Sequence, residues 1–205
     1  MDLGRGIYGL MNLWFRTRRL DLNGAPWRQK LRGGWILACN HTTLMDPLAL
    51  GANFWYRRVS FLTGEIVMQG RLRQALLKGM GCIRIDRGIS DLEGIRAAIG
   101  CVKAGRCLGV FPEGGVTEDE AGHAIKSGAI LIAVQSGAPV LPLYLHPPKR
   151  RFGRWTMVVG EPLDALKACG RRFPSLSDID RASGLLQQRL DDCRSTYERW
   201  RGEAT

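Results

Sequence analysis

The clearest strand in the chain is Trp35-Ile36-Leu37-Ala38-Cys39, a short apolar run between turn-forming residues. A run of this length and composition is typical of a strand buried on both faces. Asn40 and His41 follow it directly, and Asp46 and Pro47 come five and six residues after the histidine. We expect Asp46 to be the N-cap of a helix whose first residue is Pro47, because Asp is favoured at the cap and Pro at the first helical position.

The remaining chain repeats a rhythm of short apolar run, turn and amphipathic segment. This alternation indicates an α/β domain in which helices flank a largely parallel or mixed central sheet. With 205 residues, one domain is expected. The other expected strands are Val59–Leu62, Cys82–Ile85, Cys107–Phe111, Val140–Leu145 and Thr156–Val159. The expected helices are Pro47–Trp55, Leu72–Lys78, Leu92–Lys103, Ile125–Gln135 and Ile179–Trp200.

Residues 1–33 are expected to form an amphipathic membrane-interface segment ahead of the domain at 34–205. Helical spacing places five apolar residues on one face: Ile7, Leu10, Met11, Trp14 and Phe15. Arginines border this face. Two interpretations stay open: the face packs on the domain's own core, or it inserts into a membrane surface, which basic borders with Trp and Phe would suit.

The formal net charge is +11, from 30 Lys and Arg against 19 Asp and Glu. Such a charge predicts an anionic partner, and nucleic acid, anionic lipid or a phosphorylated substrate would each suit it. No apolar run approaches the ~20 residues of a spanning helix, and no secretory signal is recognisable. We therefore expect a cytoplasmic protein, soluble or peripheral on the cytoplasmic face of a membrane.

The six cysteines form no Cys-x-x-Cys pair and no zinc-like cluster with histidine. Several of them lie in apolar runs. We expect buried free thiols in a reducing compartment and no metal site.

His41 is the best-placed of three histidines, because ligands gather where the strands of an open α/β sheet end. In a continuous helix, five residues would turn His41 and Asp46 apart by roughly 140°, whereas a loop closing on the helix start can bring them together. Asp46 would then fix the imidazole tautomer, and the other ring nitrogen could remove a proton from an alcohol. The alternative is that Asp46 only caps the helix.

Four blocks of the sequence resemble, in order, the signatures of the glycerolipid acyltransferase family, which includes the lysophosphatidic acid and glycerol-3-phosphate acyltransferases. The blocks are Asn40–Asp46, Gly81–Arg87, Val110–Gly115 and Val140–Leu143. Ile125–Ala129 is similar to the family's Lys-containing helix start, and Gly160–Pro162 to its closing turn.

The resemblance implies acyl transfer from acyl-CoA or acyl-carrier protein to a lyso-lipid hydroxyl, in phospholipid biosynthesis. It implies His41 as general base, Asp46 as its partner, and an acceptor site. The implied acceptor-binding residues are Arg84, Arg87, Glu113, Gly114 and Gly115, with Asn40 and Lys126 as further candidates. No metal and no bound organic cofactor are implied. The expected partners are the thioester donor, the lyso-lipid and an anionic membrane surface, and nucleic acid is not expected.

Two positions depart from the family pattern. Val116 follows the third block where an arginine sequence is common, and Arg84 stands where an apolar residue is common. Arg84 either substitutes for the missing charge, or the acceptor has a head group other than that of lysophosphatidic acid. The stretch Lys149–Trp155 interleaves cations with aromatics and is either a solvated hairpin or a contact for anionic lipid or a carrier. A non-enzymatic lipid- or nucleic-acid-binding protein, and a transacylase that needs no thioester, remain as alternatives.

Overall fold

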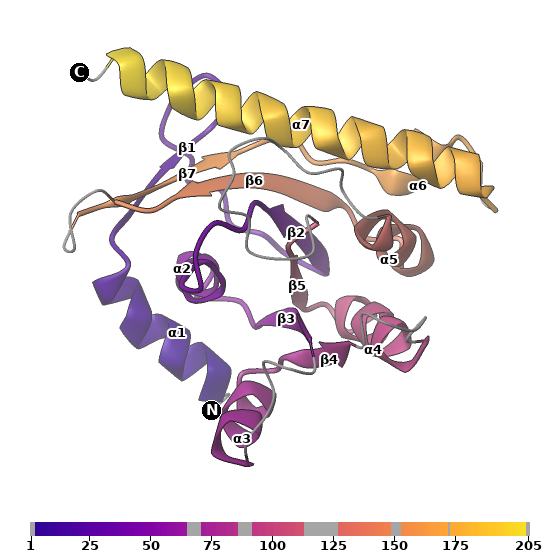
Figure 1. The fold of residues 1–205 in the computed structure, drawn as a ribbon, viewed down its shortest axis with the longest axis horizontal. Coiled ribbons are helices and arrows are strands. Elements are labelled where there is room, and N and C mark those ends of the chain that lie inside the picture. Colours follow the sequence, from indigo (N-terminus) through magenta and orange to yellow (C-terminus); the bar gives the residue numbers. More distant parts are fainter. Residues whose placement is uncertain are drawn as a thin grey trace.

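The computed structural model describes residues 3–64, 71–85, 92–112, 127–148, 153–171 and 173–203. These form one seven-stranded sheet flanked by helices on both faces (Figure 1). The strands are β1 (Thr17–Leu20), β2 (Trp35–Cys39), β3 (Val59–Gly64), β4 (Ile83–Ile85), β5 (Cys107–Val110), β6 (Val140–His146) and β7 (Trp155–Val159). The helices are α1 (Leu3–Trp14), α2 (Asp46–Asn53), α3 (Arg71–Gly79), α4 (Leu92–Lys103), α5 (Gly128–Ser136), α6 (Ala165–Cys169) and α7 (Leu176–Glu203).

The sheet is mixed, with the strand order β1-β7-β6-β2-β5-β3-β4. Strands β2 to β6 run parallel to one another, β7 is antiparallel to β6, and β1 is parallel to β7. The start of β7 and the start of β1 therefore lie at the same edge of the sheet as the carboxyl ends of β2 and β6. We call this edge the His41 edge, because His41 follows β2 there.

The expected α/β class and mixed sheet are confirmed, and each expected strand is present with bounds shifted by at most two residues. The expected helix Ile125–Gln135 begins in residues outside the described ranges, and its described part is α5. Two elements were not expected. Strand β1 has the sequence TRRL, which carries little apolar pattern because it lies at the sheet edge, and α6 has only five residues, too few to show a helical period.

The central strand β2 is apolar at every position because helices cover both of its faces. Leu37 and Cys39 belong to a core cluster with residues of α1 and α2. Ile36 and Ala38 point the other way and belong to a second cluster with α4, α5, α6 and α7. Figure 1 shows α7 lying along β6 and β7 on the face opposite to α1 and α2.

Helix α1 uses two faces rather than the single apolar face expected. Tyr8 and Met11 of the helix pack in the core, and so does Phe15, which follows the last helical residue. Leu10, Leu13 and Trp14 are 74%, 79% and 67% exposed. Of the five residues expected to share one apolar face, Met11 and Phe15 contact the core, whereas Leu10 and Trp14 are exposed. The apolar surface of the helix is thus wider than the area that packs on the core. Both interpretations thus keep support: one face packs on the core and another is left exposed.

None of the helices in the described ranges is long and apolar enough to cross a membrane. All six cysteines are free thiols, and five of them are buried. Among the described residues, no group of His, Cys, Asp and Glu side chains has the arrangement of a metal site.

Helices α1 and α2 approach closely at a glycine. A methyl group added at Gly51 of α2 would lie 2.2 Å from the ring of Tyr8, which is fully buried. The ring cannot move aside without displacing other core residues. Glycine at position 51 is therefore a packing requirement for docking α1 on the helix that begins at Asp46.

We predict that Gly51→Ala lowers the free energy of unfolding by about 1–3 kcal/mol through overpacking, as measured by urea denaturation. The matched control is Gly100→Ala in α4, where nothing lies within 4 Å of the added methyl group. This change should raise stability by about 0.5–1 kcal/mol, because Ala is the better helix former. Equal effects of the two substitutions would contradict the packing argument.

Candidate active site

At the end of β2, the side chain of Asn40 makes the hydrogen bonds to β6 that a further strand residue would make through its backbone. The amide of Asn40 donates from Nδ2 to the backbone oxygen of Leu145 at 3.0 Å, and its Oδ1 accepts from the backbone N–H of Leu145 at 2.7 Å. These two bonds continue the pairing of β2 with β6 by one residue after the backbone ladder stops. Asn40, expected only as a further candidate, therefore fixes the point from which His41 projects.

The carboxylate of Asp46 is fully buried and gathers the loop that follows Asn40. Its Oδ2 lies 3.0 Å from Nδ1 of His41 and accepts from the backbone N–H groups of Thr42 and Thr43, both at 2.7 Å. Its Oδ1 accepts from the hydroxyl of Thr43 at 2.6 Å. A buried charge is tolerated when donors of this kind surround it, so the four contacts account for the depth of this carboxylate.

Asp46 does not cap the helix as expected. It is the first residue of α2, with Met45 at the N-cap position and no side-chain cap bond, while Pro47 keeps a place in the first turn. The carboxylate instead turns back toward the loop, because the N–H groups of residues 42 and 43 point at it from the N-terminal side. The expectation that a loop would join His41 to Asp46 holds.

The imidazole of His41 is held on its ring face as well as at Nδ1. It stacks on Phe111 with ring centroids 4.2 Å apart and an interplanar angle of 23°. Phe111 in turn stacks on Phe61 of β3 with ring centroids 6.0 Å apart. The side chain of His41 is only 14% exposed. Two kinds of contact, one from helix α2 and one from the residue after β5, thus set its orientation.

Phe111 belongs to the block Val110–Gly115 and is a site residue for which the sequence pattern predicts no role. It follows β5, whose Val110 is in register with Ala38 of the neighbouring strand β2. Parallel neighbours in register end at the same level, so the residue after β5 lies beside the residues after β2. This adjacency of β5 and β2 depends on sheet order, which the sequence does not show.

The geometry favours one tautomer of His41. With the Asp46 carboxylate ionised, Nδ1 carries the proton and donates it to Oδ2, which leaves the lone pair of a neutral imidazole on Nε2. This nitrogen can accept a proton from a hydroxyl, and the carboxylate stabilises the imidazolium that forms. The arrangement is that of a general base with an orienting carboxylate.

The predicted acceptor-binding residues are only partly within the described ranges. Arg84 is exposed on β4, in register with Thr63 of β3. Sheet order places β4 three strands from β2, an offset of roughly 14 Å, so Arg84 lies on an edge strand and is not directly beside His41. The other predicted residues fall outside the described ranges: Arg87, Glu113, Gly114, Gly115 and Lys126.

Known proteins resemble this chain in sequence and in fold. The family model described as Acyltransferase matches residues 23–146. A protein of Bacillus subtilis named 1-acyl-sn-glycerol-3-phosphate acyltransferase is 25% identical over 170 residues, which cover 80% of this chain and 83% of the relative. A protein of the same name from Borreliella burgdorferi is 26% identical over 144 residues, covering 69% of this chain and 57% of the relative.

Among solved structures, the fold matches the crystal structure of the 1-acyl-sn-glycerophosphate (LPA) acyltransferase, PlsC, from Thermotoga maritima. The TM-score is 0.61 at 20% identity, and the match covers 94% of this chain and 77% of the other. The match of residues 23–146 extends over more than half of the chain and contains Asn40, His41 and Asp46. The chain belongs to the acyltransferase family.

Proposed function

We propose that this protein transfers a fatty acyl group from acyl-CoA or acyl-carrier protein to the free hydroxyl of 1-acylglycerol 3-phosphate or a related lyso-lipid. His41 is the general base and Asp46 orients it. The observation that carries this proposal is the 3.0 Å contact between His41 Nδ1 and a fully buried Asp46 carboxylate. Membership of the acyltransferase family supports acyl transfer as the reaction.

The reaction needs no acyl-enzyme. Nε2 of His41 takes the proton of the acceptor hydroxyl as its oxygen attacks the thioester carbonyl carbon. The tetrahedral oxyanion then collapses, the carbon–sulfur bond breaks, and the imidazolium returns the proton to the departing thiolate. The products are an ester and a free thiol, and the enzyme is regenerated.

The names of the relatives bear on the identity of the acceptor. Both curated relatives are named for 1-acyl-sn-glycerol-3-phosphate. This favours a glycerol phosphate acceptor over the different head group that Val116 and Arg84 suggested. We further propose that the enzyme works peripherally at the anionic cytoplasmic face of a membrane, where a lyso-lipid is found, and the exposed Leu10, Leu13 and Trp14 support this.

We predict that His41→Ala lowers kcat by about 100-fold or more, because a positioned general base contributes about that factor. The matched control is His146→Ala, whose ring stacks on Tyr197 at the end of β6 and has no place in the reaction. Both variants are assayed for thioester-dependent acylation of the lyso-lipid, with the released free thiol as the readout. Near-normal turnover of the His41 variant would refute the mechanism.

Asp46→Asn should lower kcat by a similar factor and also reduce stability. The amide retains the shape of the carboxylate but removes the charge that supports the imidazolium. It also has one acceptor oxygen instead of two for the donors of His41, Thr42 and Thr43. We expect the free energy of unfolding to fall by about 1–3 kcal/mol, measured by chemical denaturation, with a smaller change for His41→Ala. Unchanged turnover in folded Asp46→Asn would show that the carboxylate does not assist catalysis.

The acceptor is tested with a panel of lyso-lipids that differ only in head group. We expect kcat/KM for 1-acylglycerol 3-phosphate to exceed that for choline, ethanolamine and glycerol head groups by about tenfold or more, a difference of ~1.4 kcal/mol. Equal or reversed preference would favour a different head group. Acyl transfer without any thioester would point instead to a transacylase.

A further inference from the structure

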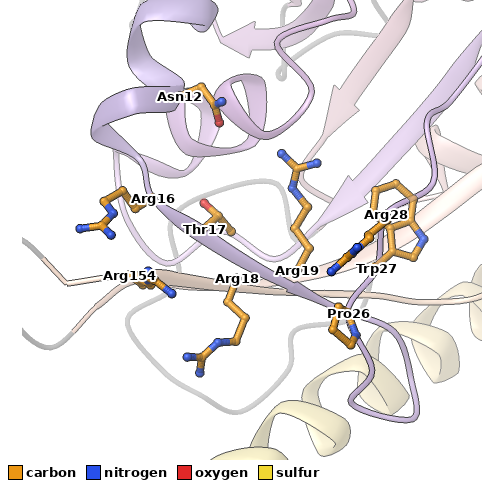
Figure 2. A pocket seen from close by; sticks show the side chains of 9 residues that line it. All are labelled: Asn12, Arg16, Thr17, Arg18, Arg19, Pro26, Trp27, Arg28 and Arg154. Carbon is orange, nitrogen blue, oxygen red and sulfur yellow. The ribbon is translucent and has the colours of Figure 1, made fainter.

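Five arginines surround an open pocket of about 650 Å³ at the β1 side of the sheet (Figure 2). Its lining residues are Asn12, Arg16, Thr17, Arg18, Arg19, Pro26, Trp27, Arg28 and Arg154. None of these lining residues is acidic. We refer to it as the arginine pocket.

The five arginines come from three separate parts of the chain. Arg16 precedes β1 and two more lie on it, Arg28 follows the turn after β1, and Arg154 precedes β7. Charges on an edge strand alone could be explained as protection against pairing with another chain. That explanation does not cover Arg28 and Arg154, which line the same depression but are not on β1. Figure 2 shows that Arg18 and Arg19 leave β1 on opposite sides, so the two line different parts of this open depression.

The positive charge of the arginine pocket is not neutralised within the described residues. Arg19 donates from Nε to Oδ1 of Asn53 at 3.1 Å, and the guanidinium of Arg18 lies 4.7 Å from the ring centroid of Trp200. Both partners are uncharged, and none of the five arginines pairs with a described Asp or Glu. Burial lowers the pKa of Arg19, which reflects the cost of holding its charge out of water. A bound anion would offset this cost.

The pocket adjoins an exposed apolar surface. Asn12 of α1 lines the pocket, and the same helix exposes Leu10, Leu13 and Trp14. Helix α1 packs on α2, and the loop directly before α2 exposes Leu44 and Met45 by 79% and 51%. Large apolar side chains exposed beside a basic cluster are typical of a surface that meets the lipid–water interface.

The arginine pocket also lies at the His41 edge. Thr17 at the start of β1 is in register with Trp155 at the start of β7, and Thr156 pairs with His146 at the carboxyl end of β6. Three strand spacings, roughly 14 Å, separate β1 from β2, which leads to His41. An anion bound in the pocket would thus be held at the edge where a lipid acceptor must arrive.

We propose that the arginine pocket binds the phosphate group of an anionic membrane phospholipid, while the exposed face of α1 contacts the acyl region. The site holds a bilayer lipid and not the reacting acceptor. The inference rests on the proposed action at a membrane. It names the groups that make the contact, because guanidinium groups bind phosphate oxygens bidentately. From its sequence, the stretch Lys149–Trp155 is interpreted as either a solvated hairpin or a contact for anionic lipid or a carrier. Lys149–Phe152 lie outside the described ranges, and Arg154 lines the pocket.

The test is binding of the full chain to vesicles of phosphatidylcholine with and without phosphatidylglycerol, measured by co-sedimentation. The pocket variant is Arg16→Gln/Arg28→Gln/Arg154→Gln, which changes three exposed side chains. The matched control is Arg96→Gln/Lys103→Gln/Arg106→Gln, which removes the same charge. Arg96 and Lys103 lie on α4, Arg106 lies directly before β5 at the opposite edge of the sheet, and all three are exposed. Circular dichroism and thermal unfolding confirm that both variants are folded.

We expect the pocket variant to bind phosphatidylglycerol vesicles about 100-fold more weakly, at about fivefold for each arginine, and the control to change much less. Binding of the unaltered chain should weaken as salt is raised. Equal losses in the two variants would overturn the site. A loss of affinity for soluble coenzyme A by the pocket variant, with vesicle binding retained, would overturn the lipid as its ligand. Vesicle binding by His41→Ala should match the unaltered chain, which separates this inference from the proposed catalysis.

Discussion

The buried carboxylate of Asp46 is the constraint around which the site is built. A charge with no exposed surface requires donors on both oxygens, and the chain supplies them from His41, Thr42 and Thr43. Meeting that requirement dictates the path of the loop between β2 and α2. The Nδ1 atom of His41 is turned toward this carboxylate. The role proposed for Nε2 therefore follows from how the loop satisfies a buried charge.

The two parallel strands beside β2, β5 and β6, also contact the residues of the site. Strand β6 receives the Asn40 side chain, and β5 delivers Phe111 to the ring of His41. Helix α2 begins at the carboxylate and is backed by α1, whose Tyr8 packs on Gly51. The site is therefore held by three strands and two helices from separate parts of the chain between α1 and β6. This favours the rigid placement that the proposed general base requires.

The His41 edge combines the proposed general base with surface suited to lipid. The His41 imidazole is almost buried, while residues of α1 and of the loop before α2 expose large apolar side chains, and arginines gather at β1. Reversal of β7 and β1 relative to the other five strands creates this arrangement, since it brings the starts of these strands to the same edge as the carboxyl ends of β2 and β6. A fully parallel sheet would have placed Arg16 and Arg154 at the opposite edge.

Local sequence was sufficient to predict the α/β class, strand β2 and the joining of His41 to Asp46 by a loop, because apolar runs and an Asp-Pro helix start act over a few residues. It was insufficient for β1, whose polar residues form a strand only by pairing with β7, and for the two faces of α1. The capping role given to Asp46 was wrong, because the competing donors of the loop could not be seen from spacing. Phe111 and the arginine pocket depend on which strands are neighbours, and Arg84 is separated from His41 for the same reason. The sequence alone determined which residues could do the chemistry, and tertiary structure decided which of them meet, since sheet order is set by long-range packing and not by local pattern.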